Sequence, residues 1–220
     1  MSETSDMERL RTRPHSDWKD GFLFVGNQPA LDFVNTRPLQ DGQYTELLPD
    51  FQALLRWFQA AGLLDRKTAS KLAETWDGSA KARRAVAQMR DWRERLRSEI
   101  VSWESGNRVR QRTLGELNRL MQAHPMLARI TNDTGRLRAE LWFDPKTPAD
   151  LIAPLAHSAA DLFSSADRSR VRMCGNCVLH FYDTSKKGTR HWCSMRLCGN
   201  RQKAAAYAER RRKGRRSKRS

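Results

Sequence analysis

The stretch CGNCVLHFYDTSKKGTRHWCSMRLC, residues 174–198, holds all four cysteines of this 220-residue chain. Their spacing is C-x2-C-x15-C-x4-C. Two close cysteine pairs joined by a spacer that folds back are the pattern with which a chain surrounds a tetrahedral zinc ion. We therefore predict one structural zinc ion, held by Cys174, Cys177, Cys193 and Cys198.

Two histidines lie near the cysteine pairs and compete with them as ligands. His180 follows the first pair and His191 precedes the second. Because both pairs are complete, we expect the histidines to be surface, phosphate-contacting or supporting groups. The same cysteines can also serve as small buried side chains or as redox-active pairs, and both alternatives stay open. A zinc ion with four protein ligands has no open coordination position, which argues for a folding role and against metal catalysis.

Around the cysteines, the sequence predicts a treble-clef-like module over residues 171–213. Residues 178–182 indicate a strand, 183–190 a turn and 200–213 a helix. The second cysteine pair then lies near a helix N-terminus, which favours thiolates. A module of this size has too little apolar core to fold alone, so we expect the metal to hold it together.

Positive charge gathers in and behind this module. Residues 171–220 hold 15 Lys and Arg against 2 Asp and Glu, whereas the first 170 residues hold 26 against 23. A polycation attached to a folded metal module indicates a nucleic acid first, and an anionic membrane or acidic protein second. A tail that only keeps the protein in solution is the remaining alternative.

The candidate nucleic-acid contacts lie on the turn, beside the second cysteine pair, and along the final helix. They are Lys186, Lys187, Arg190, Arg196, Arg201, Lys203, Arg210, Arg211 and Arg212. Phosphate contacts from such residues make binding strongly salt-dependent. Base recognition needs one or two arginines, such as Arg201, at the edge of a groove. Any single member can equally be a solvated side chain, so the prediction rests on the group.

Residues 21–166 predict a separate domain that is mainly α with a small β-hairpin, an α+β arrangement. Apolar residues at helical spacing from Val86 to Trp103 predict an amphipathic helix over 80–105. Residues 126–143 alternate with period two about the turn NDTG, which predicts a hairpin. Thr113 and Glu116 form a capping-box pattern before a further helix.

Both ends of the chain, residues 1–20 and 214–220, have the composition of disordered segments. The first lacks the apolar core of a signal peptide, and no run reaches the ~18 apolar residues that a membrane span needs. We therefore expect a cytoplasmic protein, a setting in which clustered cysteines are more often metal ligands than disulfides. No hydrolase, nucleotide-loop or metalloprotease motif is present in the sequence, so we do not expect an enzyme.

Asp32 and Asn35 are polar residues within the apolar segment ALDFVNT, residues 30–36. They are our candidates for binding an unidentified small ligand or protein on the first domain. Local hydrogen bonding to backbone amides is the alternative that the sequence favours. A homodimer through the exposed side of the 80–105 helix also stays open.

The run CGNR at residues 198–201, behind a C-x2-C pair and FYDTS, resembles the CGNR zinc finger family over the whole module. GNQPALDFVNT (26–36) and LLRWFQAAGLL (54–64) resemble the ABATE domain that usually precedes this finger. The resemblance implies a bacterial stress-induced transcriptional regulator, with zinc on the four cysteines and DNA on the finger. Alternatives are an RNA- or ribosome-associated protein, and a protein-interaction module with a non-specific basic anchor.

Overall fold

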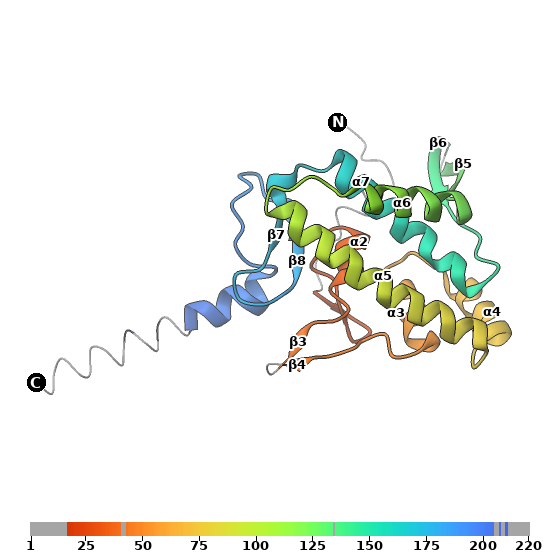
Figure 1. The fold of residues 1–220 in the computed structure, drawn as a ribbon, viewed down its shortest axis with the longest axis horizontal. Coiled ribbons are helices and arrows are strands. Elements are labelled where there is room, and N and C mark those ends of the chain that lie inside the picture. The colour runs from red at the N-terminus through yellow and green to blue at the C-terminus, as the bar shows by residue number, and fades with distance from the viewer. Residues whose placement is uncertain (1–16, 41–42, 134, 205–206, 208–209, 211–220) are drawn as a thin grey trace, which may run out of the picture.

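The structure is a computed structural model that describes residues 17–40, 43–133, 135–204, 207 and 210. Helices dominate these residues, and their strands form two-stranded antiparallel sheets (Figure 1). The predicted class, mainly α with a small β-hairpin before a zinc-finger module, is confirmed. Residues 1–16 of the predicted disordered leader (1–20), the predicted tail over 214–220, and Arg211 and Arg212 lie outside the described residues, whereas Trp18–Lys19 of that leader form a strand.

The first domain is organised around α5 (Ala80–Glu104), which matches the predicted amphipathic helix. Within this domain, α5 packs against α2 (Pro29–Val34), α3 (Phe51–Ala60) and the 3-10 turn η1 (Pro148–Ile152). The remaining helices are α4 (Arg66–Trp76), which packs on α3, α6 (Gln111–Ala123), and α7 (Ala153–Ser165), which packs on α2 and α6. Among the described residues, no helix is long and apolar enough to span a membrane.

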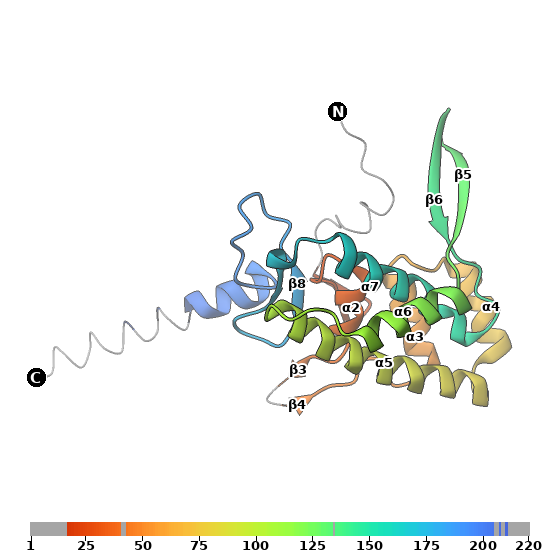
Figure 2. The same ribbon diagram turned by 45° about the horizontal axis from the view of Figure 1, so that its top comes forward.

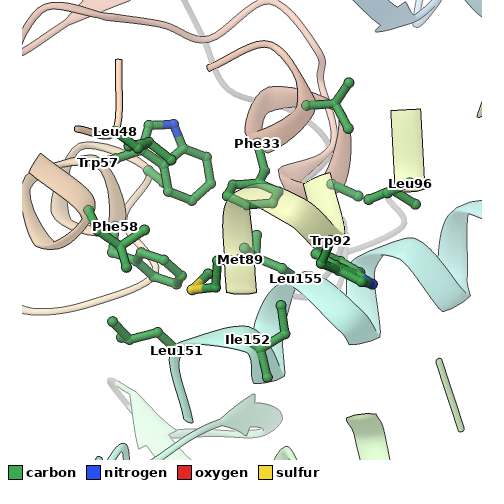
Figure 3. Close-up of a cluster of buried hydrophobic side chains, with 14 of the residues drawn as sticks. Phe33, Leu48, Trp57, Phe58, Met89, Trp92, Leu96, Leu151, Ile152 and Leu155 are labelled. Atoms are coloured by element: carbon green, nitrogen blue, oxygen red, sulfur yellow. The ribbon is translucent and has the colours of Figure 1, made fainter. Parts of the chain in front are cut away.

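An aromatic cluster fills the centre of this helical domain (Figure 3). Trp57 is fully buried, and its ring lies 5.6 Å from that of Phe33 and 5.2 Å from that of Phe58. Phe33 also stacks on Trp92 of α5 at 5.8 Å. Such ring pairs add about 0.5–1.5 kcal/mol each beyond the burial of their area. The rings therefore fix α2, α3 and α5 against one another.

The predicted capping box at Thr113 and Glu116 is wrong, although the helix is present. Helix α6 begins at Gln111, so Thr113 lies inside its first turn. The Thr113 hydroxyl donates to the Glu99 carboxylate at 2.8 Å, and the Arg110 amide donates to the same group at 2.8 Å. The buried carboxylate of Glu99 in α5 therefore accepts the hydrogen bonds at the start of α6, in place of the local pair Thr113 and Glu116 that the sequence had predicted.

Short strands complete the fold. The predicted hairpin is present as β5 (Leu127–Asp133) and β6 (Arg136–Trp142), which project from the helical body (Figure 2). Two smaller pairs lie nearer the N-terminus: β1 (Trp18–Lys19) with β2 (Phe22–Leu23), and β3 (Leu39–Gln40) with β4 (Gln43–Tyr44).

The module that holds the cysteines follows a short 3-10 turn, η2 (Arg168–Arg170). It contains β7 (Val171–Met173) paired antiparallel with β8 (His180–Tyr182), and the π-helical turn η3 (Met195–Gly199). Residues 200–204 continue as an α-helix. This helix and the β5–β6 hairpin lie at opposite ends of the molecule, with α2 between them (Figures 1 and 2).

Candidate metal centre and nucleic-acid surface

The four cysteine sulfurs meet in one cluster, all within 4.8 Å of one another. Sγ–Sγ distances are 3.6 Å from Cys177 to Cys193, 3.6 Å from Cys193 to Cys198, and 3.7 Å from Cys198 to Cys177. Tetrahedral zinc at about 2.3 Å from each sulfur separates the sulfurs by about 3.8 Å. A disulfide would need about 2.05 Å. The donor set therefore fits a tetrahedral metal ion.

Backbone hydrogen bonds hold both cysteine turns in place. The Cys174 amide donates to the Leu179 carbonyl at 2.9 Å, and the Cys198 amide donates to the Ser194 carbonyl at 2.9 Å. The Gly175 amide joins the two turns by donating to the His191 carbonyl at 3.2 Å. The site is thus positioned by the main chain before any metal is considered.

Close sulfurs share protons unevenly when no cation balances them. Hydrogen bonds from Cys177 and Cys193 lower the pKa of the Cys174 thiol. Hydrogen bonding to Cys174 raises the pKa of Cys177 to about 12. Hydrogen bonding to Cys174 and Cys177, together with burial, raises the pKa of Cys193. Metal binding requires deprotonated sulfurs, so a dication in the cluster would displace these protons.

Neither candidate histidine joins the sulfur cluster formed by the described residues. His180 is buried, with Nδ1 3.5 Å from a carboxylate oxygen of Glu104 at the end of α5. His191 is exposed. The structure thus gathers the cysteine set that the spacing had predicted.

The loop between the two cysteine pairs is held by inward-facing polar groups. Asp183 is fully buried and accepts hydrogen bonds from the Ser185 and Arg190 amides, both at 2.8 Å. The Arg190 guanidinium donates to the Trp192 and Cys193 carbonyls and lies 4.9 Å from the Phe181 ring centroid. Arg190, one of the predicted nucleic-acid residues, is therefore committed to internal contacts.

Arg170 and Arg172 also stabilise this loop, and sequence reasoning missed both. Arg170 donates to the Asp183 and Ser185 carbonyls at 2.9 and 2.8 Å, and Arg172 donates to the Gly188 carbonyl at 2.8 Å. Their sequence positions just before the first cysteine give no signal that they fold back on a loop more than ten residues away.

The other described nucleic-acid candidates form an exposed set. Within the described part of the chain, none of them takes part in an ion pair: Lys186, Lys187, Arg196, Arg201, Lys203 and Arg210. Their side chains are free to meet an external anion, in contrast to Arg190.

Asp32 and Asn35 lie where the helical domain meets the finger. Asn35, the residue that ends α2, exchanges two hydrogen bonds with the backbone of His180 in β8, at 2.8 and 2.9 Å. Asp32 accepts from the Gly26 amide at 2.7 Å. The structure gives both side chains buried structural contacts, and the ligand-binding role predicted for them stays a prediction.

A second contact to β8 comes from Gly26 and Asn27, to which the sequence reasoning had given no site role. The Gly26 carbonyl accepts from the Tyr182 amide at 2.8 Å, and the Asn27 side chain donates to the Tyr182 carbonyl at 2.9 Å. A Cβ on Gly26 would lie 2.7 Å from the Asp32 amide nitrogen, so only glycine fits there. The motif GNQPALDFVNT thus contacts the finger through both of its ends.

Apolar contacts and Glu104 reinforce this interface. Leu23 and Val25 are buried in one cluster with Leu179, Phe181 and three of the cysteines. The Met173 amide donates to Glu104 at 2.7 Å. The finger therefore packs on the chain that precedes α2, and the predicted division into domains at 166–171 stays a prediction.

Two families match the chain. ABATE, described as "Putative stress-induced transcription regulator", matches residues 27–166, and the CGNR zinc finger matches residues 170–211. Comparison with the curated proteins gives no match. The order of the two matches agrees with the architecture expected from the motifs. The chain belongs to the ABATE family and carries a CGNR zinc finger behind its ABATE domain.

Proposed function

We propose that the protein binds one zinc ion through Cys174, Cys177, Cys193 and Cys198, and that the zinc-held finger binds DNA in transcription regulation. The observation that carries the proposal is the exposed helical segment behind the sulfur cluster, whose cations form no ion pair with any described residue. Zinc would supply structural cross-linking there and no chemistry, since all four positions are taken by protein.

The final helix has the form of a groove-binding element. Asn200, Arg201, Lys203, Tyr207 and Arg210 are exposed, so the helix is covered by little of the protein. Its base is anchored by a 2.7 Å hydrogen bond from Gln202 to Asn176, in the first cysteine turn. An exposed helix that is anchored at its base, and whose cations form no ion pair within the described part of the chain, suits the major groove of DNA.

The loop tip offers a second contact. Lys186 and Lys187 are exposed at a turn whose backbone is fixed by Asp183, Arg170 and Arg172. Because that turn is held from inside, its lysines lose little additional backbone freedom on binding. They suit phosphate contacts that position the finger, while Arg201 suits the reading of a base edge.

The ABATE domain suits the role of sensor or scaffold. It forms hydrogen bonds to β8 of the finger through Asn35, Asn27 and Gly26. Together with the family's description as a stress-induced transcription regulator, this contact supports a cytoplasmic regulator in which the first domain controls finger placement. We propose no chemical reaction for the chain.

The test is selection of bound fragments from random DNA by the full chain, purified with one equivalent of zinc, at roughly 150 mM salt. We expect an enriched sequence motif. Arg201→Gln should relax that motif at one position at a cost of about 1–3 kcal/mol. Lys186→Gln with Lys187→Gln should weaken binding to all sequences alike. The slope of log K against log salt should then fall in magnitude by about 0.9 for each phosphate that is no longer neutralised.

The matched control is Lys67→Gln with Lys71→Gln on α4, which removes the same charge from exposed positions outside the finger. It should leave binding unchanged. Equal losses from both double variants, or binding without any motif, would contradict a sequence-reading finger. Stronger binding to structured RNA than to any DNA would move the proposal to RNA.

A further inference from the structure

A cavity of about 640 Å³ lies between the β5–β6 hairpin and the helical body. Its floor includes Gln28, His157 and Ser158, and its opposite wall includes Arg129, Glu140 and Trp142. Known small-molecule sites span about 300–1,000 Å³ and combine apolar walls with a few convergent polar groups. The size and composition of this cavity therefore fit a small organic ligand.

The hairpin has two unlike faces, and the polar one lines the cavity. Arg129 pairs with Glu140 across the strands, and the Arg129 guanidinium lies 5.1 Å from the Trp142 ring centroid. The opposite face carries Ile130 and Leu137, which are 73% and 74% exposed. An isolated two-stranded hairpin is marginally stable in water, so a ligand between hairpin and body would add contacts that the hairpin lacks.

The floor holds a side-chain donor that reaches the cavity. Gln28 is 2% exposed, and its side-chain oxygen lies 3.5 Å from the Ser158 hydroxyl. That hydroxyl is itself occupied as acceptor for the Ala30 amide at 3.0 Å. Among the described residues, the Gln28 amide nitrogen has no hydrogen-bond partner. Because this donor lines the cavity and is not held by a neighbouring side chain of the described residues, it is available to a hydrogen-bond acceptor on a ligand.

Charge narrows the class of ligand. Three carboxylates line the cavity; Arg129 pairs with Glu140 and Lys146 pairs with Asp144, which leaves Asp65 without an ion pair among the described residues. Anions are disfavoured in such surroundings. Trp142, Phe143 and Leu63 supply apolar and aromatic walls. We propose that this cavity binds a ring-bearing organic molecule, uncharged or cationic, whose hydrogen-bond acceptor meets the Gln28 amide.

The cavity lies next to the segment through which the helical domain contacts β8 of the finger. Gln28 directly follows Gly26 and Asn27, which hold Tyr182, and α2 continues to Asn35, which holds His180. A ligand that orders Gln28 therefore acts on the segment that positions β8. A regulatory meaning for this contact rests on the proposed function, whereas ligand binding and its effect on β8 do not.

The probe for the test is the uncharged naphthyl ketone prodan, whose fluorescence reports a dry environment and whose ketone is an acceptor. Its analogue with a carboxylate on the acyl chain serves as the anionic match. With the zinc-loaded full chain, we expect saturable binding of one prodan per chain, and binding of the analogue at least tenfold weaker.

Variants locate the probe. His157→Trp should fill the cavity and weaken prodan binding at least tenfold. Gln28→Leu keeps the volume, removes the donor offered to prodan together with the 3.5 Å contact to Ser158, and should weaken binding about 2–10-fold. Ile130→Ser on the outer face of the hairpin is the control and should change binding less than twofold. Circular dichroism checks the fold of each variant, and Gln28→Leu keeps the test decisive if His157→Trp does not fold.

Loss of prodan binding in Ile130→Ser alone would place the probe on the outer face and overturn the proposal. Equal binding of the anionic analogue, or no saturable binding of either probe, would do the same. Hydrogen exchange at the His180 and Tyr182 amides should slow at least threefold with prodan bound. Unchanged exchange would overturn the link to the finger. All of these measurements are made without DNA, so their failure is separate from failure of DNA binding.

Discussion

The helical domain and the finger are folded by different forces. The helical domain buries a continuous aromatic and aliphatic core in which Trp57, Phe33 and Phe58 are inaccessible to water. The buried cluster of the finger combines three cysteines with Leu179 and Phe181, and it includes Leu23 and Val25 from the preceding chain. One region is stabilised by burial of apolar area, while the other depends on metal coordination, loop hydrogen bonds and its neighbour.

Removing the metal ligands should separate the two regions most sharply. In Cys193→Ser, or after treatment with a strong zinc chelator, we expect the finger to unfold, because structural zinc contributes about 10–16 kcal/mol in zinc-finger peptides. The helices of the first domain should persist. Hydrogen exchange of the full chain should show rapid exchange over residues 171–204 and continued protection in α5.

The control for this variant is Ser194→Ala, next to the cysteine and also buried. It removes a hydroxyl that donates to Asp17 at 2.6 Å and accepts from the Arg196 and Leu197 amides, but it keeps all four sulfurs. It should retain one zinc per chain by elemental analysis. Protection of the finger that survives loss of Cys193 would contradict a metal-dependent fold.

A cavity in the aromatic core tests the other region. Trp57→Ala should cost the helical domain about 3–5 kcal/mol, because a fully buried ring is lost and the core relaxes only in part. Thermal unfolding followed at 222 nm measures the loss. Zinc content should stay at one equivalent below the unfolding temperature, and release of zinc in the folded variant would show that the regions are not independently stabilised.

Asn35→Ala tests the joint between them. The change leaves the buried amide and carbonyl of His180 without their partner, at about 1–3 kcal/mol for each unpaired group. We expect faster hydrogen exchange in β8 and little change in α5. Asn107→Ala removes a side-chain amide from an exposed loop, and it should leave β8 unaffected. The same exchange in β8 for both variants would argue against the joint.

Much of the helical domain could be predicted from sequence because its forces are periodic. The apolar spacing from Val86 to Trp103 located α5, and alternation about NDTG located β5 and β6. The predicted capping box at Thr113 was wrong because its residues suit a local cap, whereas in the fold the Thr113 hydroxyl donates to the buried carboxylate of Glu99, which is distant in sequence. Local patterns carry no information about such tertiary competitors.

The candidate site likewise has a part that could be predicted from the sequence and a part that could not. Cysteine spacing identified the sulfur cluster, since metal geometry restricts which spacings close around one ion. Charge alone did not separate Arg190, which binds the carbonyls of its own loop, from exposed Lys186 and Lys187. The sequence also did not show whether the Asn35 side chain binds a ligand or, as in the structure, contacts β8. Only the fold decides which polar groups face inward.

The smallest expected effect compares one carboxylate from each region, the buried Asp183 of the finger and the half-buried Asp150 of the helical domain. Burial acts to raise the pKa of Asp183, but hydrogen bonds from Ser185 and the Arg190 amide outweigh it and lower the pKa below 3.8. For Asp150 burial likewise acts to raise the pKa, and bonds from the Thr147 amide and His124 outweigh it. A lowered folded-state pKa gives stability that is present above about pH 3.8 and is lost as pH falls through the folded value.

Asp183→Asn should therefore weaken the finger by about 1 kcal/mol at neutral pH, the difference between a charged and a neutral hydrogen-bond acceptor. Asp150→Asn should affect only the helical domain. Both differences from the unsubstituted chain should shrink below pH 3.8, as its own carboxylates become protonated. In the finger, zinc release will set in at higher pH, because its thiolates bind protons more tightly than Asp183 does. Acid titration with exchange and metal readouts separates these steps. Simultaneous loss of metal and of Asp183-dependent stability would show that the loop and the metal site unfold as one unit.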